Sequence, residues 1–320
     1  MKVKNKVLSV LEDNRDVFVS GTELAEKLNV SRNAIWKAIN SLKEDGYDIV
    51  SAPHKGYLLL DSNDLLSKEA VSLFLDQDFK SCPLHIYKTL ASTNATAKEM
   101  ALNGACDRTI VISEHQSAGR GRYGRTFFSP DRTGIYISFI LRPHITFSEA
   151  TRYTIYAAVA TLDIITKYSD IKPAIKWVND IYIGNKKCCG ILTEATADFE
   201  SGNVESLIIG IGINISTTVF PPELSGRACS ICNPDINRNE FTAEIINHLF
   251  NMIDYIPFEA VLRTYKRNNL VLNKNITFTK NGSSFNGTAT DIDAQGRLIV
   301  RCGNEDITLN SGEVSLENIF

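Results

Sequence analysis

The chain has 320 residues, of which 43% are hydrophobic and 22% charged, and its formal net charge is −3. This length allows two or three domains, and this composition is typical of a soluble globular protein rather than a disordered or fibrous one. The small net charge excludes a global field that attracts nucleic acid or membranes, so any basic surface must be local.

The seven cysteines are an odd number without a regular framework, which indicates a reducing compartment. The pair Cys229-x-x-Cys232 has no second pair or nearby histidine, so a structural role is favoured over zinc, and no metal ligands are assigned. The sequence shows neither a secretion signal nor a stretch long enough to span a membrane. We therefore expect a cytoplasmic protein without a membrane partner.

The first 62 residues show the pattern of a winged helix-turn-helix. Helical periodicity predicts helices over residues 2–13 and 22–28, and Ser31 is suited to cap a third helix that stops at Gly46. A short hairpin over residues 48–60 follows as the wing. This arrangement predicts a DNA-binding domain, although equal numbers of acids and bases leave a helical docking module as the alternative.

The third helix carries its apolar residues on one face and polar, basic residues on the other. Basic and amide side chains on such a face suit phosphates and base edges. The expected DNA contacts are Ser31, Arg32, Asn33, Trp36, Lys37, Asn40 and Lys43, with Lys55 at the tip of the wing.

The polar stretch 61–64 is expected to be the linker, and residues 65–75 are expected to form a helix that opens the next domain. Strands are then predicted at 84–88, 109–115, 135–141, 174–178, 189–196 and 205–215, and helices at 94–102, 148–168, 239–252 and 258–268. Runs of strands separated by a few helices predict an α+β sheet covered on one face.

Glycine and arginine alternate in residues 116–125, QSAGRGRYGR, which we call the Gly/Arg loop. Glycine lets the backbone approach a ligand, and arginine offers donors suited to phosphate oxygens. The spacing also matches the dinucleotide fingerprint, but an extended segment follows where that fingerprint needs a helix. The loop therefore predicts handling of a nucleotide or acyl phosphate, with a solvated hairpin as the alternative.

Four further clusters interrupt the apolar pattern. Ser92-Thr93-Asn94 precedes a helix, where it caps the helix or binds a small polar ligand. The run 176–180, KWVND, ends an apolar strand with polar groups, so Asp180 holds Mg²⁺ or a lysine unless the run is a plain turn. Lys187 precedes a strand that contains Gly190. The run 210–214, GIGIN, implies a ligand against the backbone or tight packing.

Together these motifs resemble the biotin–protein ligase family. The order Ser-Thr-Asn, Gly-Arg-Gly-Arg-x-Gly-Arg, Lys-Trp-x-Asn-Asp, Lys-x-x-Gly-Ile-Leu-x-Glu and Gly-Ile-Gly-x-Asn extends over the whole central domain. The winged helix in front resembles the bifunctional branch that also represses the biotin operon. Two departures are Val178, where the family usually has proline, and Ala91, where aspartate is common.

The resemblance implies a multidomain α+β protein with three parts. These are a winged helix-turn-helix (1–62), a mixed α/β, class II synthetase-like ligase domain (65–270), and a small C-terminal SH3-like β-barrel (271–320). The signals for the last are the hairpin dipeptide Asn281-Gly282 and strands expected at 276–280, 288–293, 297–302 and 307–310.

The implied reaction forms biotinyl-5′-adenylate from biotin and ATP with Mg²⁺, and then transfers biotin to a lysine of a biotin carboxyl carrier protein. The implied catalytic residues are Lys187, Arg122 and Asp180. The implied ligand-binding residues are Ser92, Thr93, Asn94, Gln116, Gly119, Arg120, Gly121, Arg122, Arg125, Lys176, Trp177, Asn179, Lys187, Gly190 and Asn214. The adenylate is further implied to favour a homodimer that binds operator DNA.

Two alternatives stay open. A ligand-sensing transcription factor without activity is disfavoured by Arg120, Arg122 and Lys187. A lipoate-type acyl ligase of similar fold lacks the front module and the Gly/Arg loop. Biotin-dependent pyrophosphate exchange separates the three hypotheses.

Overall fold

The computed structural model of the chain describes residues 2–197, 203–280, 283–310, 312 and 314–316. The chain forms two compact units. The first comprises Met1–Lys80 with Asn237–Glu244, and the second comprises Ser81–Ile236 with Ile245–Phe320. Within the described residues, no helix is long and apolar enough to cross a membrane.

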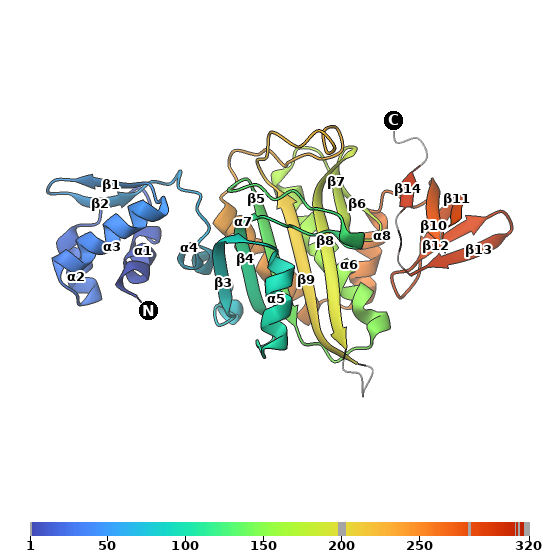
Figure 1. The fold of residues 1–320 in the computed structure, drawn as a ribbon, viewed down its shortest axis with the longest axis horizontal. Coiled ribbons are helices and arrows are strands. Elements are labelled where there is room, and N and C mark those ends of the chain that lie inside the picture. The colour runs from blue at the N-terminus through green and yellow to red at the C-terminus, as the bar shows by residue number, and fades with distance from the viewer. Residues whose placement is uncertain (1, 198–202, 281–282, 311, 313, 317–320) are drawn as a thin grey trace. The chain divides into compact units, whose positions relative to one another are not determined.

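The first unit begins with the expected helix-turn-helix and wing, which are visible in Figure 1. Its helices are α1 (Val3–Glu12), α2 (Gly21–Leu28) and α3 (Arg32–Asp45), and strands β1 (Ile49–Ala52) and β2 (Gly56–Leu59) form an antiparallel hairpin. Ser31 caps α3 by accepting a hydrogen bond from the Ala34 amide, and Gly46 ends it at φ 101°. The predicted helix signals are confirmed.

The apolar faces of these helices make one core. Periodic side chains from α1, α2 and α3 meet the inward residues of the hairpin there, as amphipathic helices require. The fully buried members are Val7, Leu11, Leu24, Ile35, Ile39 and Leu59. Because the core uses the inner face of α3, the polar face of that helix is left exposed.

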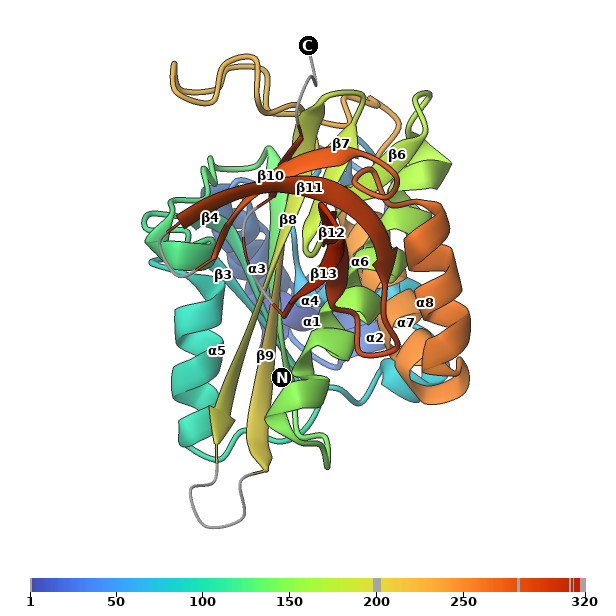
Figure 2. The same ribbon diagram turned by 90° about the vertical axis from the view of Figure 1, so that its right-hand side faces the viewer.

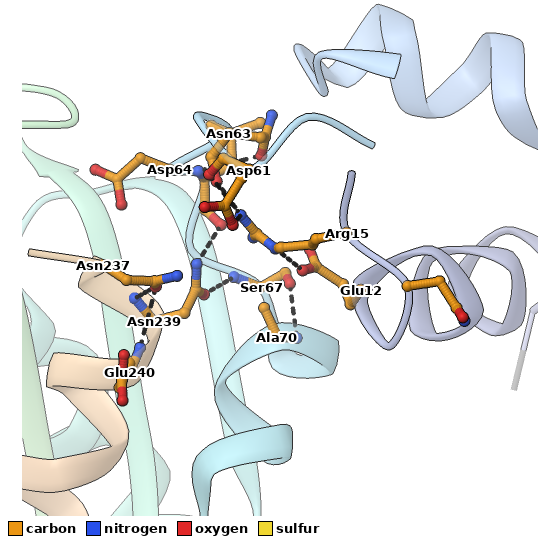
Figure 3. Close-up of polar contacts among 12 residues, drawn as sticks. Glu12, Arg15, Asp61, Asn63, Asp64, Ser67, Ala70, Asn237, Asn239 and Glu240 are labelled. Carbon is orange, nitrogen blue, oxygen red and sulfur yellow. Dashed lines mark hydrogen bonds and ion pairs between the residues drawn. The ribbon is translucent and has the colours of Figure 1, made fainter. Parts of the chain in front are cut away.

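The segment after the wing belongs to the same unit, and Figure 3 shows its polar contacts. Asn63 is 3% exposed, and its carbonyl accepts a hydrogen bond from Arg15 Nη1 at 2.9 Å. Arg15 is held in turn by Glu12 at 2.8 Å. The expected linker is therefore polar, but its backbone is bound to the end of α1.

Two further contacts tie this segment to the start of α7 (Arg238–Tyr255). Asp64 pairs with the 1% exposed side chain of Arg238 at 2.5 Å. Asn239 accepts a hydrogen bond from the Ser67 amide (Figure 3). It also donates one to the Leu65 carbonyl. Residues 65–67 lie outside any helix, and helix α4 spans Lys68–Phe74, so it begins later than expected. The short helix η1 (Gln77–Phe79) follows it.

The second unit is built on a seven-stranded mixed sheet with the order β3-β4-β5-β9-β8-β7-β6. Its strands are β3 (Leu84–Leu90), β4 (Thr109–Gln116), β5 (Gly134–Leu141), β6 (Pro173–Lys176), β7 (Asp180–Ile183), β8 (Lys186–Ala197) and β9 (Val204–Asn214). The pair β3 and β4 is parallel, and the other neighbours are antiparallel. Strand β7 was missing from the predicted strands.

Helices cover both faces of this sheet, so the expectation of one covered face was wrong. Every residue of β5 is buried. Figure 2 shows α5 (Thr93–Leu102) on one side and α6 (Ala150–Tyr168) with α8 (Phe258–Arg267) on the other. Ala97 of α5 packs on Val111 and Ile140, which completes a second cluster. A central strand covered on both faces is apolar along nearly its whole length, and in β5 Ser138 interrupts the apolar run of residues 135–141.

The C-terminal part of this unit is a five-stranded antiparallel sheet with the order β13-β12-β11-β10-β14. The strands are β10 (Asn275–Lys280), β11 (Ser283–Ile292), β12 (Leu298–Cys302), β13 (Glu305–Leu309) and β14 (Val314–Leu316). Lys280 and Ser283 are partners in the β10–β11 pair. The predicted turn residues Asn281 and Gly282 lie outside the described residues.

Candidate functional site

A cavity of about 590 Å³ lies in the second unit, among the ends of several sheet strands, the Gly/Arg loop and the C-terminal sheet. Its lining contains six cationic side chains and two acidic ones. The cations are Arg120, Arg122, Arg125, Lys176, Lys187 and Arg227, and the acids are Asp180 and Glu223. This balance favours an anionic ligand.

One wall is made by the first residues of α5 and the end of β4. Ser92 caps α5 through the Ala95 amide, so the simple capping role expected of it is present. Gln116 accepts hydrogen bonds from the Thr93 amide at 2.8 Å and from the Thr93 hydroxyl at 3.2 Å. Gln116 Nε2 also donates to Ser129. The amide of Gln116 is thereby held in one orientation beside the start of the helix.

Asn94 is fixed by strands on the other side. Its Nδ2 donates to the Leu192 carbonyl and to Glu194, and the hydroxyl of Ser138 lies 2.7 Å from its Oδ1. A Cβ on Gly210 would lie 2.0 Å from Asn94 Oδ1. Glycine is therefore required at position 210 because this side chain lies directly on the strand backbone.

The Gly/Arg loop folds back on itself like a small hairpin. Arg120 and Thr126 form an isolated antiparallel bridge, and η2 (Arg122–Gly124) makes the tip. Gly119 packs against residues 127–129, where a Cβ would lie 2.5 Å from the Phe127 carbonyl oxygen. The hairpin alternative was thus correct about the backbone, but the loop lines the cavity.

Arg122 is bound at three points within this loop and across the cavity. Its guanidinium donates to Asn179 Oδ1 at 3.1 Å, to the Gly312 carbonyl at 3.2 Å and to the Tyr123 hydroxyl at 3.1 Å. The Tyr123 ring centre lies 5.0 Å from the guanidinium carbon, within cation–π range. The C-terminal sheet region therefore contributes directly to the position of a loop arginine.

Two side chains in the turn from β6 to β7 are hydrogen-bonded to other segments of the chain. Trp177 Nε1 donates to the Gly296 carbonyl at 3.0 Å, and Asn179 Nδ2 donates to the Ile191 carbonyl at 2.6 Å. The peptide bond between Trp177 and Val178 is cis, and Val178 is buried. Val178, where the family usually has proline, therefore lies in a turn whose flanking side chains are hydrogen-bonded to other segments.

Lys187 and Asp180 face each other across neighbouring strands, with Nζ 2.6 Å from Oδ1. Both side chains are partly exposed to the cavity, at 33% and 23%. The carboxylate and the amine therefore form an ion pair at the cavity. Of the two roles the sequence left open for Asp180, the structure contains the lysine contact.

The floor of the cavity is a pair of glycines with an aromatic ring on top. Gly190 and Gly212 are direct partners in the β8–β9 pair. A Cβ on Gly212 would lie 2.6 Å from the Phe127 ring, and one on Gly190 would lie 3.3 Å from it. Of the two readings of the GIGIN run, the structure contains the tight packing, and the packed Phe127 lines the cavity.

Most of the predicted catalytic and ligand-binding residues line this cavity together. They are Ser92, Thr93, Asn94, Gln116, Arg120, Gly121, Arg122, Arg125, Lys176, Trp177, Asn179, Asp180, Lys187 and Gly190. Gly119 and Asn214 are absent from the lining that the structure describes. Asn214 donates instead to the Cys229 carbonyl at 3.0 Å, and this contact holds the segment after β9.

Sequence reasoning missed several lining residues, chiefly Phe127, Phe128, Tyr182, Leu224 and Arg227. Phe127 follows the Gly/Arg loop directly and could have been inferred from the two glycines that accommodate it. Arg227 lies in a long irregular segment without a periodic signal. Its backbone is placed beside β8 by a hydrogen bond from the Lys187 amide.

The predicted DNA contacts lie in the first unit as expected from the periodicity. Ser31, Arg32, Asn33, Trp36, Lys37, Lys43 and Lys55 are exposed, and Asn40 is half-buried. Lys43 donates to Ser51 of the wing at 2.9 Å, and Lys55 lies over the Phe18 ring. These residues make one polar face from α3 and the hairpin, with Trp36 55% exposed on it.

Comparison with known proteins gives three family matches along the chain. Residues 86–214 match the model of the biotin/lipoate A/B protein ligase family, residues 3–58 match an HTH domain, and residues 271–317 match the biotin protein ligase C-terminal domain. These three ranges correspond, in the same order, to the seven-stranded sheet, the winged helix-turn-helix and the C-terminal sheet.

Among curated proteins, the chain is similar to the bifunctional ligase/repressor BirA of Bacillus subtilis, with 32% identity over 98% of both chains. The BirA protein of Escherichia coli is 27% identical over 98% of this chain and 97% of its own. Among solved structures, the biotin protein ligase from Aquifex aeolicus in complex with biotin and ATP matches with a TM-score of 0.62. That match has 23% identity and covers 73% of this chain and 98% of the other, so it supports the fold alone.

Proposed function

Since this chain belongs to the biotin/lipoate A/B protein ligase family, we propose that it is an ATP-dependent biotin–protein ligase and a transcriptional repressor. In the first step the biotin carboxylate attacks the α-phosphorus of ATP, and pyrophosphate leaves. In the second step the ε-amine of a carrier lysine attacks the acyl carbon of biotinyl-5′-adenylate, AMP leaves, and the amine loses a proton. The proposed carrier is a biotin carboxyl carrier protein.

One observation carries this proposal: a single cavity joins a polar wall to a cationic loop. Thr93 and Gln116 on the wall offer hydroxyl and amide groups for the ureido ring of biotin. Arg120 and Arg122 on the loop offer donors for the carboxylate and the phosphates. A volume of about 590 Å³ falls within the usual range for small-molecule sites.

The cations supply the electrostatic part of catalysis. Bringing a carboxylate to the α-phosphate places two anions together, and fixed positive groups lower the energy of the crowded transition state. Arg122 and Lys187 are assigned this catalytic role, with Arg125 and Lys176 as further phosphate partners. A folded loop also excludes water, which protects the mixed anhydride from hydrolysis.

The residues present fit a magnesium ion that is bound mainly through phosphates. Mg²⁺ retains several waters and is held by one or two carboxylates with substrate phosphates. No cluster of three or more metal-ligating side chains occurs among the described residues, but Asp180 presents a carboxylate to the cavity. When bound, the ion would neutralise phosphate charge. Asp180 is also placed to orient the incoming carrier lysine.

The winged helix is assigned to operator DNA. The exposed face of α3 would enter the major groove, with Arg32 and Lys37 toward phosphates or bases and Lys55 of the wing toward the backbone. We further propose that the adenylate favours a homodimer, because a two-fold operator requires two recognition helices. The ligand then acts as both intermediate and corepressor.

The finer structural assignments are part of the same proposal. We retain the boundaries 1–62, 65–270 and 271–320 for the DNA-binding, ligase and C-terminal domains. The ligase sheet is classed as class II synthetase-like and the C-terminal sheet as SH3-like. A cytoplasmic location follows from the proposed carrier and operator.

Biotin-dependent exchange of labelled pyrophosphate into ATP tests the first step. Exchange that requires biotin and is not supported by lipoate is the expected result. Exchange with lipoate instead would favour the acyl ligase alternative. Absence of exchange together with adenylate-dependent DNA binding would favour a transcription factor without ligase activity.

A further inference from the structure

A buried tyrosine outside the described cavity lining contacts the backbone next to Asn179. Tyr265 lies on α8 with 0% exposure, and its hydroxyl donates to the Val178 carbonyl at 2.8 Å. Asn179 is the next residue along the chain and lines the cavity. A hydrogen bond at this carbonyl therefore fixes the peptide plane from which the Asn179 side chain projects.

The position of Tyr265 is set by the segment that follows it. The Ile175 amide donates to the Asn268 carbonyl at 2.8 Å, and the Leu270 amide donates to the Ile175 carbonyl at 2.7 Å. The end of α8 is thus paired with β6 just before the turn. Tyr265 lies about one helical turn before Asn268, and its hydroxyl contacts Val178 in the segment between β6 and β7.

From Asn179 the chain of contacts leads to the Gly/Arg loop. Asn179 Oδ1 accepts a hydrogen bond from Arg122 Nη1 at 3.1 Å, while its Nδ2 is bound to the Ile191 carbonyl. The side chain therefore has one favourable orientation, in which its oxygen faces Arg122. A shift of the turn would move the acceptor away from the guanidinium.

We propose that Tyr265 is a positioning residue for adenylate formation, which acts through the Val178 carbonyl and Asn179 on the guanidinium of Arg122. The proposal rests on the proposed ligase function, because Arg122 is assigned to the carboxylate and phosphates there. Tyr265 itself touches no substrate. Loss of its hydroxyl is therefore expected to slow adenylate formation and to leave the affinity for biotin unchanged.

The chemistry of the tyrosine suits this role. Burial raises the pKa of the Tyr265 phenol well above its ordinary value, so the hydroxyl keeps its proton and remains a donor. Tyr265→Phe removes the donor, keeps the ring in the core and leaves a buried carbonyl without that partner. The biotin wall around Thr93 and Gln116 has its own hydrogen bonds and does not depend on this contact.

Tyr156 provides a matched control. It is 9% exposed on α6, and its hydroxyl donates to the Ile256 carbonyl at 3.0 Å. Tyr156→Phe therefore deletes the same kind of bond in the same unit, away from the cavity lining. Any loss of stability that comes from one tyrosine-to-carbonyl bond should occur in both variants.

The experiment measures biotin-dependent pyrophosphate exchange, biotin affinity by calorimetry and thermal stability for both variants. Tyr265→Phe should lower the exchange kcat about ten-fold, which corresponds to about 1.36 kcal/mol in the barrier. Its biotin Kd should match the wild type, and its Tm should match that of Tyr156→Phe. Equal exchange rates for the two variants, or a parallel loss of biotin affinity in Tyr265→Phe, would overturn the proposal.

A double-mutant cycle tests the route through Asn179. Asn179→Ala alone should reduce exchange, and addition of Tyr265→Phe should reduce it little further, because both changes break one chain of contacts. Fully additive losses would contradict that route. Wild-type protein without exchange would instead refute the proposed ligase function, so the two failures are distinguishable.

Discussion

Lys187 Nζ lies 2.6 Å from Asp180 Oδ1, between adjacent strands at the edge of the cavity. The pair places a partly exposed cation at the cavity, with its carboxylate partner beside it. An incoming phosphate or acyl oxygen can take the amine as a donor while the carboxylate remains close. Asp180 begins β7 and Lys187 lies near the start of β8, so the short hairpin brings the two side chains together.

Lys187→Ala should weaken binding of a non-hydrolysable biotinyl-adenylate analogue roughly 10- to 100-fold, the range for a lost hydrogen bond to a charged group. The fold should persist because the side chain is partly exposed. Calorimetry measures the change, with Lys186→Ala as the neighbouring control. Unchanged affinity in Lys187→Ala would remove this residue from the site.

Ser138→Ala should raise the biotin Kd about ten-fold, because the Ser138 hydroxyl contacts both Thr93 Oγ1 and Asn94 Oδ1. Ser113→Ala is the matched control, since Ser113 is also fully buried in the sheet but donates to the His115 carbonyl. Equal biotin affinity for the two variants would show that the Asn94 wall does not contact biotin.

Asp64→Ala should destabilise the first unit by about 3 kcal/mol, because it removes a carboxylate that pairs with the buried guanidinium of Arg238. Asp61→Ala should cost below about 1 kcal/mol, since Asp61 is 72% exposed and lies 3.9 Å from Arg15. Urea denaturation followed by a winged-helix probe compares them. Similar midpoints for both variants would argue against this role of Arg238.

Arg32→Ala or Lys37→Ala should each weaken DNA binding and reduce the salt slope, log K against log salt, by about 1 if the residue contacts phosphate. The probe is a duplex selected from random sequences by the wild-type chain in the presence of biotin and ATP. Lys6→Ala, an exposed lysine on α1, is the control. Slopes that stay at the wild-type value would place DNA elsewhere on the unit.

Local signals made much of the fold predictable. Ser31 and Gly46 set the ends of α3, and the apolar run of residues 135–141 indicated a strand within one residue of β5. These signals work because capping and periodicity depend on neighbouring residues. Strand β7 was missed because it has four residues and begins at a polar pair that also fits a turn.

The features that could not be predicted from the sequence depend on contacts between segments that are far apart in the chain. The Gly190–Gly212 pair, the Phe127 ring above it and the Tyr265 contact with Val178 join segments far apart in the chain. Asn63 was expected in a polar linker, but the residue is buried and its carbonyl accepts a hydrogen bond from Arg15. Asn214 was expected at the ligand, but its donor is used by the Cys229 carbonyl.

The central claim is best tested by mass spectrometry of a purified biotin carboxyl carrier domain incubated with this protein, biotin and ATP. One biotinyl group should appear on a single lysine, and the product should depend on both small molecules. A carrier whose mass stays unchanged, under conditions in which a known biotin–protein ligase modifies it, would contradict the account.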